Sequence, residues 1–394
     1  MKTSPLRKLA AACIVAAGVC FVIGLYATFL TDKNASQRDF ISYWAAGHQL
    51  VHGADPYDLG AVQALEITVG RTADLPVLAM RNPPIAFFLV WPLGLFGPKI
   101  SLVIWLMVLL AGLSISIWVL WLIYGQANTR LHLFGYAFAP AIACLMAGQF
   151  GIFLLVGVAL FLKFHKSQPY LAGAALLLCV LKPHLFLPFG IVLILFAVTR
   201  GNYRIPAGFA AAFLASCALS FGLDRQAWSQ YSAMMHAGGA LDEAIPALSV
   251  RFRFLISPHT VWLQFVPEVA ACIWAVWFFW TRRDRWNWLD HGLLLLLVSA
   301  MCAPYAFFTD ESMLLPAVLA GLYQATGARR SMLPLALFAG ASLIEVLANV
   351  QIISMYFLWT TPAWLCWYLY ATGRIGGRTK DVRVEGAVPE QARG

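Results

Sequence analysis

The chain has 394 residues, of which 61% are hydrophobic and 11% charged, and its mean hydropathy is +0.75. A water-soluble domain carries about a quarter charged residues, so this composition excludes a soluble enzyme, a disordered chain and a disulfide scaffold. Apolar runs of about 20 residues recur along the chain and predict an all-α, polytopic membrane protein. The net charge of +9 does not indicate nucleic-acid binding, because the basic residues lie in short clusters between apolar runs.

The first predicted element is an apolar run from Leu9 to Leu30, preceded by Lys2, Arg7 and Lys8. The run is longer than the ~7–15 residues of a signal-peptide core, and no clear A-x-A cleavage site closes it. It predicts an uncleaved spanning helix with a cytoplasmic N-terminus. A cleaved signal peptide is the alternative.

Three stretches have the composition of segments outside the membrane: residues 31–83, 222–258 and 373–394. The remainder predicts a bundle of about twelve transmembrane helices. Their predicted starts are near Leu9, Ile100, Leu131, Phe150, Pro169, Leu185, Ile205, His259, Leu289, Glu311, Met332 and Ile352. The run 85–96 is too short to span alone, and we expect a half-buried lead-in ending at Gly97-Pro98, with a short span as the alternative.

The basic residues orient this bundle. With a cytoplasmic N-terminus and strict alternation, 18 of the 27 Lys and Arg residues fall on the cytoplasmic side, as the positive-inside rule requires. We therefore expect one membrane domain over residues 1–372 in the inner (plasma) membrane, with both termini cytoplasmic. The polar, basic segment 373–394 predicts a disordered cytoplasmic tail.

Acidic residues are concentrated in the first outer loop, residues 31–83, which holds six of the 18. After Ser36, the spacing of apolar residues predicts an amphipathic helix on the membrane surface, with Tyr43 and Trp44 at the interface. Pro56 presets a turn, and Asp58 is placed to cap the next helix.

Asp39 has two interpretations in this loop. In the first, Ser36 caps the helix and Asp39 completes an S-x-x-D capping box against the helix dipole. In the second, Asp39 is a carboxylate held at the membrane face, free to accept a proton from a hydroxyl group. The two interpretations do not exclude each other.

A series of motifs runs from this loop toward the C-terminus. It comprises Arg38-Asp39-Phe40, Tyr43-Trp44-Ala45-Ala46, Gly53-Ala54-Asp55-Pro56-Tyr57-Asp58, Asn82-Pro83-Pro84, Trp91-Pro92-Leu93, Gly148-Gln149 and Leu181-Lys182-Pro183. In order and spacing these motifs resemble glycosyltransferase family 87, which has the GT-C architecture and includes polyprenyl-phosphate-mannose-dependent mannosyltransferases. Asn82 and Gly151 depart from the residues common in the family, so mannose is not assumed.

The resemblance implies an inverting hexosyltransferase that uses a polyprenyl-phosphate sugar and a lipid or glycan acceptor on the outer face. It implies that Asp39 is the general base that deprotonates the acceptor hydroxyl. Tyr43, Tyr57 and Asp58 of the first-loop motifs are further candidates for substrate or donor binding. The topology, drawn from charge and hydropathy, places another six candidates on the same side as Asp39: Gln149, Lys182, His184, Arg251, Arg253 and Asp310.

Several of these candidates have a structural alternative. Lys182 lies between two apolar runs, where an unpaired ammonium is costly; it either binds the donor phosphate or extends to the interface beside Pro183. His184 is either an interfacial histidine or a ligand. Gln149 either bonds a sugar hydroxyl or caps its own helix.

Two further sites have alternatives of the same kind. In Arg251-Phe252-Arg253-Phe254 the guanidinium groups suit a lipid phosphate and the rings suit its chain, with an interfacial anchor as the alternative. Asp310 either orients the acceptor or caps the helix that starts at Glu311.

The sequence contains no nucleotide-binding motif and no D-x-D pair, so we expect no metal and no cofactor beyond the lipid-linked donor. The expected partners are membrane lipid, the polyprenyl-phosphate sugar and the acceptor. Two alternative functions stay open: a secondary transporter or flippase of lipid-linked sugars, and a non-catalytic protein that binds the donor. A transporter would place ionisable groups near the middle of its helices, whereas this chain keeps most of them at the ends.

Overall fold

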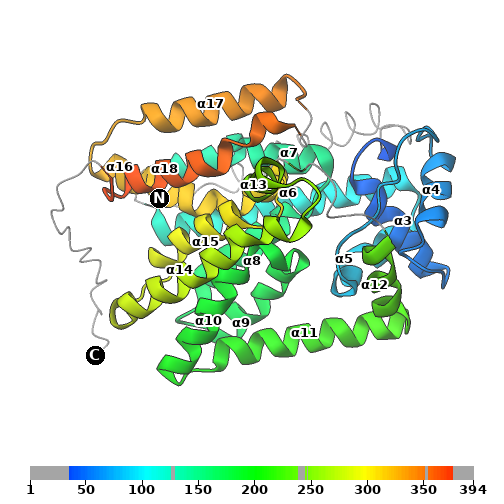
Figure 1. Ribbon diagram of the computed structural model, residues 1–394, viewed down its shortest axis with the longest axis horizontal. Helices are drawn as coiled ribbons and strands as arrows, with labels where there is room; N and C mark the ends of the chain where they lie inside the picture. The colour runs from blue at the N-terminus through cyan, green and yellow to red at the C-terminus, as the bar shows by residue number, and fades with distance from the viewer. Residues whose placement is uncertain (1–34, 126–128, 238–244, 246, 351–353, 376–394) are drawn as a thin grey trace, which may run out of the picture.

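The computed structural model describes residues 35–125, 129–237, 245, 247–350 and 354–375. Over these residues the chain is helical and contains no β-strand (Figure 1), which confirms the predicted all-α class. The predicted span from Leu9 to Leu30 and residues 376–394 of the predicted tail lie outside the described residues.

Within the described residues, three helical stretches are long and apolar enough to cross a membrane by length and composition. They are α6 (Pro98–Tyr124), α11 (Arg204–Leu223) and the run Val261–Arg285, which contains η6 (Val261–Phe265), α14 (Val266–Arg282) and η7 (Arg283–Arg285). Large apolar side chains on them are exposed at the protein surface, such as Trp118, Leu214 and Ile273. Exposed side chains of this kind suit contact with lipid.

The remaining predicted runs also form helices, in shorter pieces. These are η3 (Leu131–Ala137), α7 (Ala139–Ala147), α8 (Gly151–Phe164), α9 (Pro169–Ala175), η4 (Leu176–Leu181), η5 (Pro183–Leu185), α10 (Leu187–Arg200), α15 (His291–Cys302), η8 (Phe308–Leu314), α16 (Leu315–Gly327), α17 (Leu333–Leu347), η9 (Met355–Phe357) and α18 (Thr360–Ala371). Proline contributes to the breaks, since Pro183 opens η5 directly after η4 ends.

The short run after the first loop folds as the predicted lead-in. It consists of η1 (Pro84–Ala86), α5 (Phe87–Val90) and η2 (Trp91–Leu95), and it is too short to span. Gly97 is the N-cap of α6, with Pro98 as the first helical residue. Pro at this position is favourable because its missing N–H would be unpaired there in any case.

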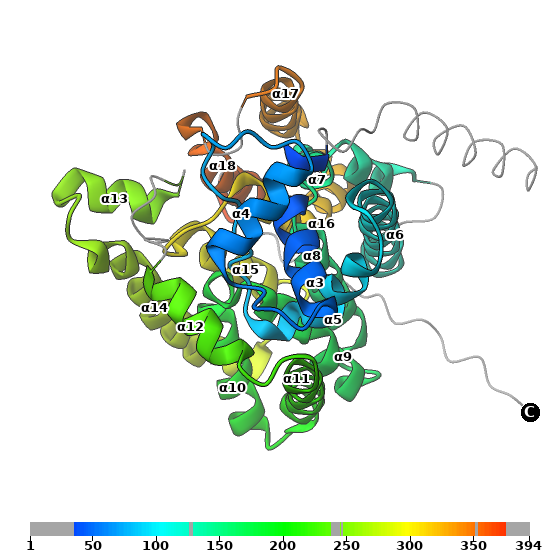
Figure 2. The same cartoon turned by 90° about the vertical axis from the view of Figure 1, so that its right-hand side faces the viewer.

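All but the last of the helices from the two predicted outer loops gather at one end of the bundle, at the right of Figure 1. The first loop contributes α3 (Phe40–Val51) and α4 (Leu59–Thr68), and the second contributes α12 (Ala227–Ala237) and α13 (Leu248–Ile256). The view onto that end, in Figure 2, shows α3 and α4 in front of the bundle helices. The rings of Tyr57 and Tyr231, 5.4 Å apart, join the first loop to α12.

Helix α3 forms where it was predicted, but protein encloses it. Tyr43 and Trp44 are buried, and the indole Nε1 of Trp44 donates to the carbonyl of Phe96 at 2.9 Å. The prediction that these two rings lie at the membrane interface is therefore wrong. The apolar positions of α3 pack against η2, α5 and α6 rather than against lipid.

A pair of glycines brings α3 against the lead-in. A Cβ on Gly47 would lie 2.2 Å from the carbonyl oxygen of Val90, and a Cβ on Gly94 would lie 2.1 Å from the carbonyl oxygen of Gly47. Only glycine allows two backbones to approach so closely. This contact fixes the position of α3, and with it that of Asp39, against the bundle.

The start of the predicted tail is ordered. Arg374 forms an ion pair with Asp290, with 2.8 Å from its Nη2 to each carboxylate oxygen. The prediction of disorder from residue 373 onward is therefore wrong for residues 373–375, which the structure describes.

Candidate active site

The carboxylate of Asp39 contacts a side chain from a distant part of the chain. Its Oδ2 accepts a 2.6 Å hydrogen bond from Nε2 of Gln149, which lies in the turn between α7 and α8. Helix α3 begins at Phe40, so Ser36 is not its N-cap, and the side chain of Asp39 makes no capping bond to it. The capping-box interpretation of Asp39 is therefore wrong.

Gln149 connects Asp39 to two further candidates. Its Oε1 accepts a hydrogen bond from the hydroxyl of Tyr43 at 3.0 Å, and Nζ of Lys182 lies 3.4 Å from the same oxygen. The side chain of Gln149 is thus committed to this network, and the alternative that it caps its own helix is wrong.

Lys182 and Asp310 form a buried ion pair. The distance from Nζ to Oδ1 is 2.6 Å, and the two side chains are 11% and 2% exposed. The ammonium also lies 5.4 Å from the centre of the Phe307 ring. Lys182 therefore points into the protein, and the alternative that it extends to the membrane interface is wrong.

Helix η8 begins at Phe308 and not at Glu311, so the predicted cap of a helix starting at Glu311 is wrong, and a different capping role falls to Asp310. Its Oδ2 accepts a 3.1 Å hydrogen bond from the backbone N–H of Phe307, the residue that precedes η8. One carboxylate oxygen thus fixes the start of η8, while the other binds Lys182. This double use orients the carboxylate rigidly.

Two glycines explain how the turn that carries Gln149 fits between its neighbours. Gly148 has a φ of +73°, and a Cβ there would lie 2.7 Å from Cβ of Phe40. A Cβ on Gly151 would lie 2.3 Å from the carbonyl oxygen of Thr309. The glycine at 151, a departure from the family pattern, therefore lets α8 start directly against η8, next to Asp310.

The surroundings of Asp39 alter its acidity. Burial raises the pKa of its carboxyl group above the usual range, and the hydrogen bond from Gln149 and the charges of Lys182 and Arg71 oppose this only in part. A raised pKa brings a carboxylate closer to the range in which a general base is most effective. Burial also raises the pKa of Tyr43 well above its usual value, which keeps the phenol protonated as a donor.

His184 lies beside this network without a hydrogen bond at Nε2. Its ring stacks on that of Tyr305, with centres 3.8 Å apart. Nε2 is buried and has no hydrogen-bond partner in the described part of the chain. Burial and the charge of Lys182 lower the pKa of His184 well below its usual value, so the ring is neutral. Nε2 is thus available to a ligand.

The two arginines of α13 differ from each other. Arg251 is exposed, whereas Arg253 is 1% exposed and donates from Nη1 to Oε1 of Gln264 at 2.8 Å. The guanidinium of Arg253 also lies over the Phe254 ring, at 4.8 Å. Phe254 packs against the apolar cluster of Ile245, Ala247 and Val250, and Tyr305 and Phe307 pack against the same cluster. Burial of Arg253 rules out the interpretation of its guanidinium as an exposed interfacial anchor.

Tyr57 and Asp58 have structural roles in the first loop. The hydroxyl of Tyr57 donates to the carbonyl of Asn82 at 2.8 Å, and Nδ2 of Asn82 donates to the carbonyl of Leu181 at 2.8 Å. Asp58 is the N-cap of α4, and its Oδ1 accepts from the N–H groups of Gly60 and Ala61. The capping role predicted for Asp58 is confirmed.

Two residues that were not predicted as site residues support the site. Asn82 joins the first loop to the segment that carries Lys182, and its position in the Asn82-Pro83-Pro84 motif was the available signal. Glu311, next to Asp310, is buried and accepts hydrogen bonds from Thr360 at 2.6 Å, Thr361 at 2.8 Å and Trp364 at 3.0 Å. It ties η8 to α18 and thereby helps to fix Asp310.

In a comparison with protein families, the model of glycosyltransferase family 87 matches residues 81–304, more than half of the chain. The chain belongs to glycosyltransferase family 87. As a family 87 protein it is a membrane glycosyltransferase. Comparisons with curated proteins and with solved structures found no match.

The family 87 match includes part of the cluster. Gln149, Lys182 and His184 lie within residues 81–304, whereas Asp39 and Asp310 lie outside on either side. The folded chain brings these groups together through the contacts described above. In the described part of the chain, no group of three or more His, Cys, Asp or Glu side chains is arranged to hold a metal ion.

Proposed function

We propose that this family 87 protein is an inverting hexosyltransferase that takes its sugar from a polyprenyl phosphate. The acceptor is a hydroxyl group of a lipid or glycan on the outer face of the plasma membrane, and Asp39 is the general base. In this proposal about twelve helices span the membrane, both chain termini are cytoplasmic, and no cofactor is needed beyond the donor.

One observation carries the proposal: Asp39, Gln149, Lys182 and Asp310 form a continuous polar chain where first-loop helix α3 meets the bundle. The network places a carboxylate of raised pKa and a cation close to each other. These are the two kinds of group that transfer from a sugar phosphate needs: a base for the acceptor and a positive charge for the leaving group.

The proposed reaction proceeds in one displacement. Asp39 takes the proton of the acceptor hydroxyl, and the oxygen attacks the anomeric carbon of the sugar. The bond from that carbon to the phosphate oxygen breaks with its electron pair, and polyprenyl phosphate leaves on the opposite side. Because bond formation and bond cleavage occur on opposite faces, the anomeric configuration inverts.

Lys182 is the proposed partner of the donor phosphate. Its ammonium carries three donors, and two acceptors lie near it, Oδ1 of Asp310 at 2.6 Å and Oε1 of Gln149 at 3.4 Å. A phosphate oxygen would add a third acceptor or displace Gln149. The unpartnered Nε2 of His184 is a second contact that we propose for the donor or the acceptor.

The decisive experiment replaces Asp39 with Asn. This change keeps the shape and a hydrogen-bonding oxygen at position 39 but removes the base, so we expect turnover to fall by roughly 10²–10⁴-fold with expression unchanged. The measurement is transfer of radiolabelled hexose from polyprenyl-phosphate sugars to an extracted lipid and glycan fraction by the purified protein.

Asp55→Asn is the matched control, because Asp55 is an acidic residue of the same loop whose Oδ1 accepts from the N–H of Tyr57 and contacts none of the cluster. It should retain near-normal transfer. Normal transfer by Asp39→Asn would overturn the role of Asp39. Solute counterflow in proteoliposomes without any sugar transfer would instead indicate a transporter, and donor binding without turnover would indicate a non-catalytic protein.

A further inference from the structure

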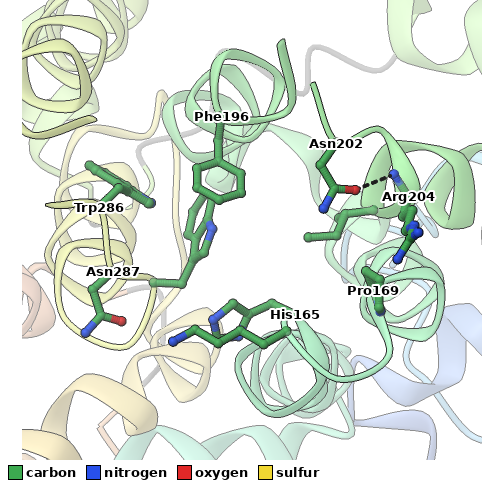
Figure 3. Close-up of a pocket in the computed structure, with 10 residues that line it drawn as sticks. His165, Pro169, Phe196, Asn202, Arg204, Trp286 and Asn287 are labelled. Carbon is green, nitrogen blue, oxygen red and sulfur yellow. Dashed lines mark hydrogen bonds between the residues drawn. The ribbon is translucent and has the colours of Figure 1, made fainter. Parts of the chain in front are cut away.

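A polar cavity lies at the end of the bundle opposite the Asp39 cluster. It has a volume of about 270 Å³ and lies where α8 and α10 end and where α9 and α11 begin, closed on one side by residues 286–288 (Figure 3). Helix α8 starts just after Gln149 and ends just before His165 at the cavity. Fourteen helical residues extend about 21 Å, so the cavity is separate from the Asp39 cluster.

The charged groups of this cavity are all cationic. Lys166 lines it from the turn after α8 and Arg204 from the first residue of α11, and no carboxylate is among its lining residues. Neither side chain forms an ion pair with an acidic residue in the described part of the chain. The Oδ1 of Asn202, which also lines the cavity, accepts from the N–H of Arg204 at 3.3 Å. The amide nitrogen of Asn202 is thereby left as the group that can donate to a ligand.

Two tryptophans that line the same cavity have unpaired indole N–H groups. Nε1 of Trp286 and Nε1 of Trp288 are both buried and have no hydrogen-bond partner in the described part of the chain. Trp288 is only 2% exposed, and the ring of Phe196 packs edge-on against it at 5.6 Å. The Trp286 ring meets that of Trp288 at 82° and stacks on His291. These contacts hold both rings in place, so each unpaired N–H has a fixed direction.

A histidine supplies a different hydrogen-bonding group. Nδ1 of His165 lies 2.9 Å from the carbonyl of Leu162, which commits the ring proton to that nitrogen. Nε2 is buried without a partner in the described residues and is left as an acceptor. The cavity thus combines several donors and two cations with one acceptor suited to a hydroxyl group. The cations and N–H donors suit the oxygens of a phosphate, and the acceptor suits a hydroxyl group on the alcohol that the phosphate esterifies.

The helices next to the cavity indicate that this phosphate belongs to a membrane lipid. Arg204 opens α11, one of the helices long enough to span. Ile194 and Val198 on α10, on either side of Phe196, are 62% and 57% exposed. Basic pockets between membrane helices, with tryptophans beside them, are typical binding sites for anionic lipid headgroups.

We propose that this cavity is a phosphate-binding site, occupied by the headgroup of an anionic phospholipid at the end of the bundle opposite Asp39. The phosphate lies between Lys166 and Arg204 and accepts from the two indole N–H groups. The headgroup hydroxyl donates to Nε2 of His165. The acyl chains leave along the exposed apolar side of α10.

The test measures binding to the purified full-length protein in a neutral detergent by native mass spectrometry. Three probes are compared: dihexanoyl phosphatidylglycerol, dihexanoyl phosphatidylcholine and inorganic phosphate. We expect phosphatidylglycerol to bind at least fivefold more tightly than phosphatidylcholine. Lys166→Gln combined with Arg204→Gln should remove this preference; both side chains are exposed, so the variant should fold. Trp286→Phe, which keeps a ring but removes the N–H, should weaken binding by about two- to fivefold.

Lys163→Gln combined with Arg285→Gln is the matched control, since it makes the same change of charge at the same end of the bundle without touching the cavity lining. It should bind like the unaltered protein. If inorganic phosphate competes fully with the lipid, the site is supported and its ligand is free phosphate. Equal binding of both lipids, unchanged binding in the Lys166/Arg204 variant, or equal loss in the control would overturn the proposal.

Discussion

Lys182 and Asp310 are 128 residues apart in the sequence, yet Nζ of one lies 2.6 Å from Oδ1 of the other, and both are buried. Each has a second attachment: Lys182 contacts Gln149, and Asp310 holds the N–H of Phe307. The pair therefore joins the segment before η5 to the start of η8. It also gives the cluster around Asp39 a cation whose position does not depend on a ligand.

The stability of this ion pair can be tested with single and double substitutions. Lys182→Met leaves the buried carboxylate of Asp310 without its partner, and we expect the free energy of unfolding to fall by about 3–5 kcal/mol. Adding Asp310→Asn should restore much of that loss, because the unpaired charge is removed. Thermal unfolding in detergent measures both effects. Arg251→Met, at an exposed arginine, should change stability by no more than about 0.5 kcal/mol. Additive losses in the double variant would contradict the pairing.

The pH dependence of turnover reports on Asp39. A base works only when ionised, so activity falls on the acid side as Asp39 takes up a proton. Because burial raises the pKa of this carboxyl group, the fall should come at a higher pH than for an ordinary carboxylate. Gln149→Leu removes the hydrogen bond that lowers this pKa and should move the fall to a still higher pH. The measurement is kcat/KM against pH.

Tyr43→Phe is the control for that experiment. It removes the hydroxyl that binds Gln149 but leaves the bond from Gln149 to Asp39 in place. The pH at which kcat/KM falls on the acid side should therefore be the same as in the unaltered protein. An unchanged profile in Gln149→Leu would show that Asp39 is not the group whose titration limits the rate.

The close approach of α3 to the lead-in predicts a steric effect at Gly47. Gly47→Ala would place a Cβ 2.2 Å from the carbonyl oxygen of Val90, so the backbones must separate. We expect a loss of about 1–3 kcal/mol in the free energy of unfolding, together with reduced activity because α3 carries Asp39 at its start. Gly190→Ala is the control: its Cβ would meet no atom within 4 Å, and alanine favours the helix. Equal stability of the two variants would disprove the steric argument.

Substitutions of Asp58 can distinguish its structural role as a helix cap from a role in substrate binding. Asp58→Ala removes the N-cap of α4, so stability should fall by about 0.5–2 kcal/mol. If Asp58 acts only as a cap, KM for the donor should stay within about twofold of the unaltered value. Asp58→Ser can still cap the helix and should recover the stability. A large rise in KM for both variants would assign Asp58 to the donor site instead.

Features that depend on neighbouring residues were predictable from the sequence. The cap at Asp58, the lead-in that ends at Gly97 and the helical runs starting near Ile100 or Ile205 all follow from local spacing, caps and hydropathy. The same information placed Gln149, Lys182 and Asp310 at one end of the bundle with Asp39. Hydropathy predicts which residues lie within the membrane, and the distribution of Lys and Arg predicts on which side of the membrane each loop lies. Neither prediction requires knowledge of how the helices pack.

The partners of those residues were not predictable. Asp39 looks like a capping residue in sequence, yet its carboxylate bonds Gln149, which follows the close approach of Gly148 to Phe40. Arg253 reads as an interfacial anchor, yet it is buried against Gln264. Tyr43 and Trp44 fit the membrane interface by composition, but α3 is enclosed by protein. A buried polar group needs a partner. The sequence allows several partners for each such group, and the packing of the helices decides which one it contacts.

By itself, the sequence determined that this chain is a helical membrane protein with a family 87 pattern, because composition and motif order are properties of the linear chain. The tertiary structure alone decided that Asp39 bonds Gln149, that Lys182 pairs with Asp310, and that His165, Lys166, Arg204 and two tryptophans line a polar cavity. The physical reason is that these contacts join helix ends far apart in sequence. Their geometry is fixed by close helix packing, which no local pattern encodes.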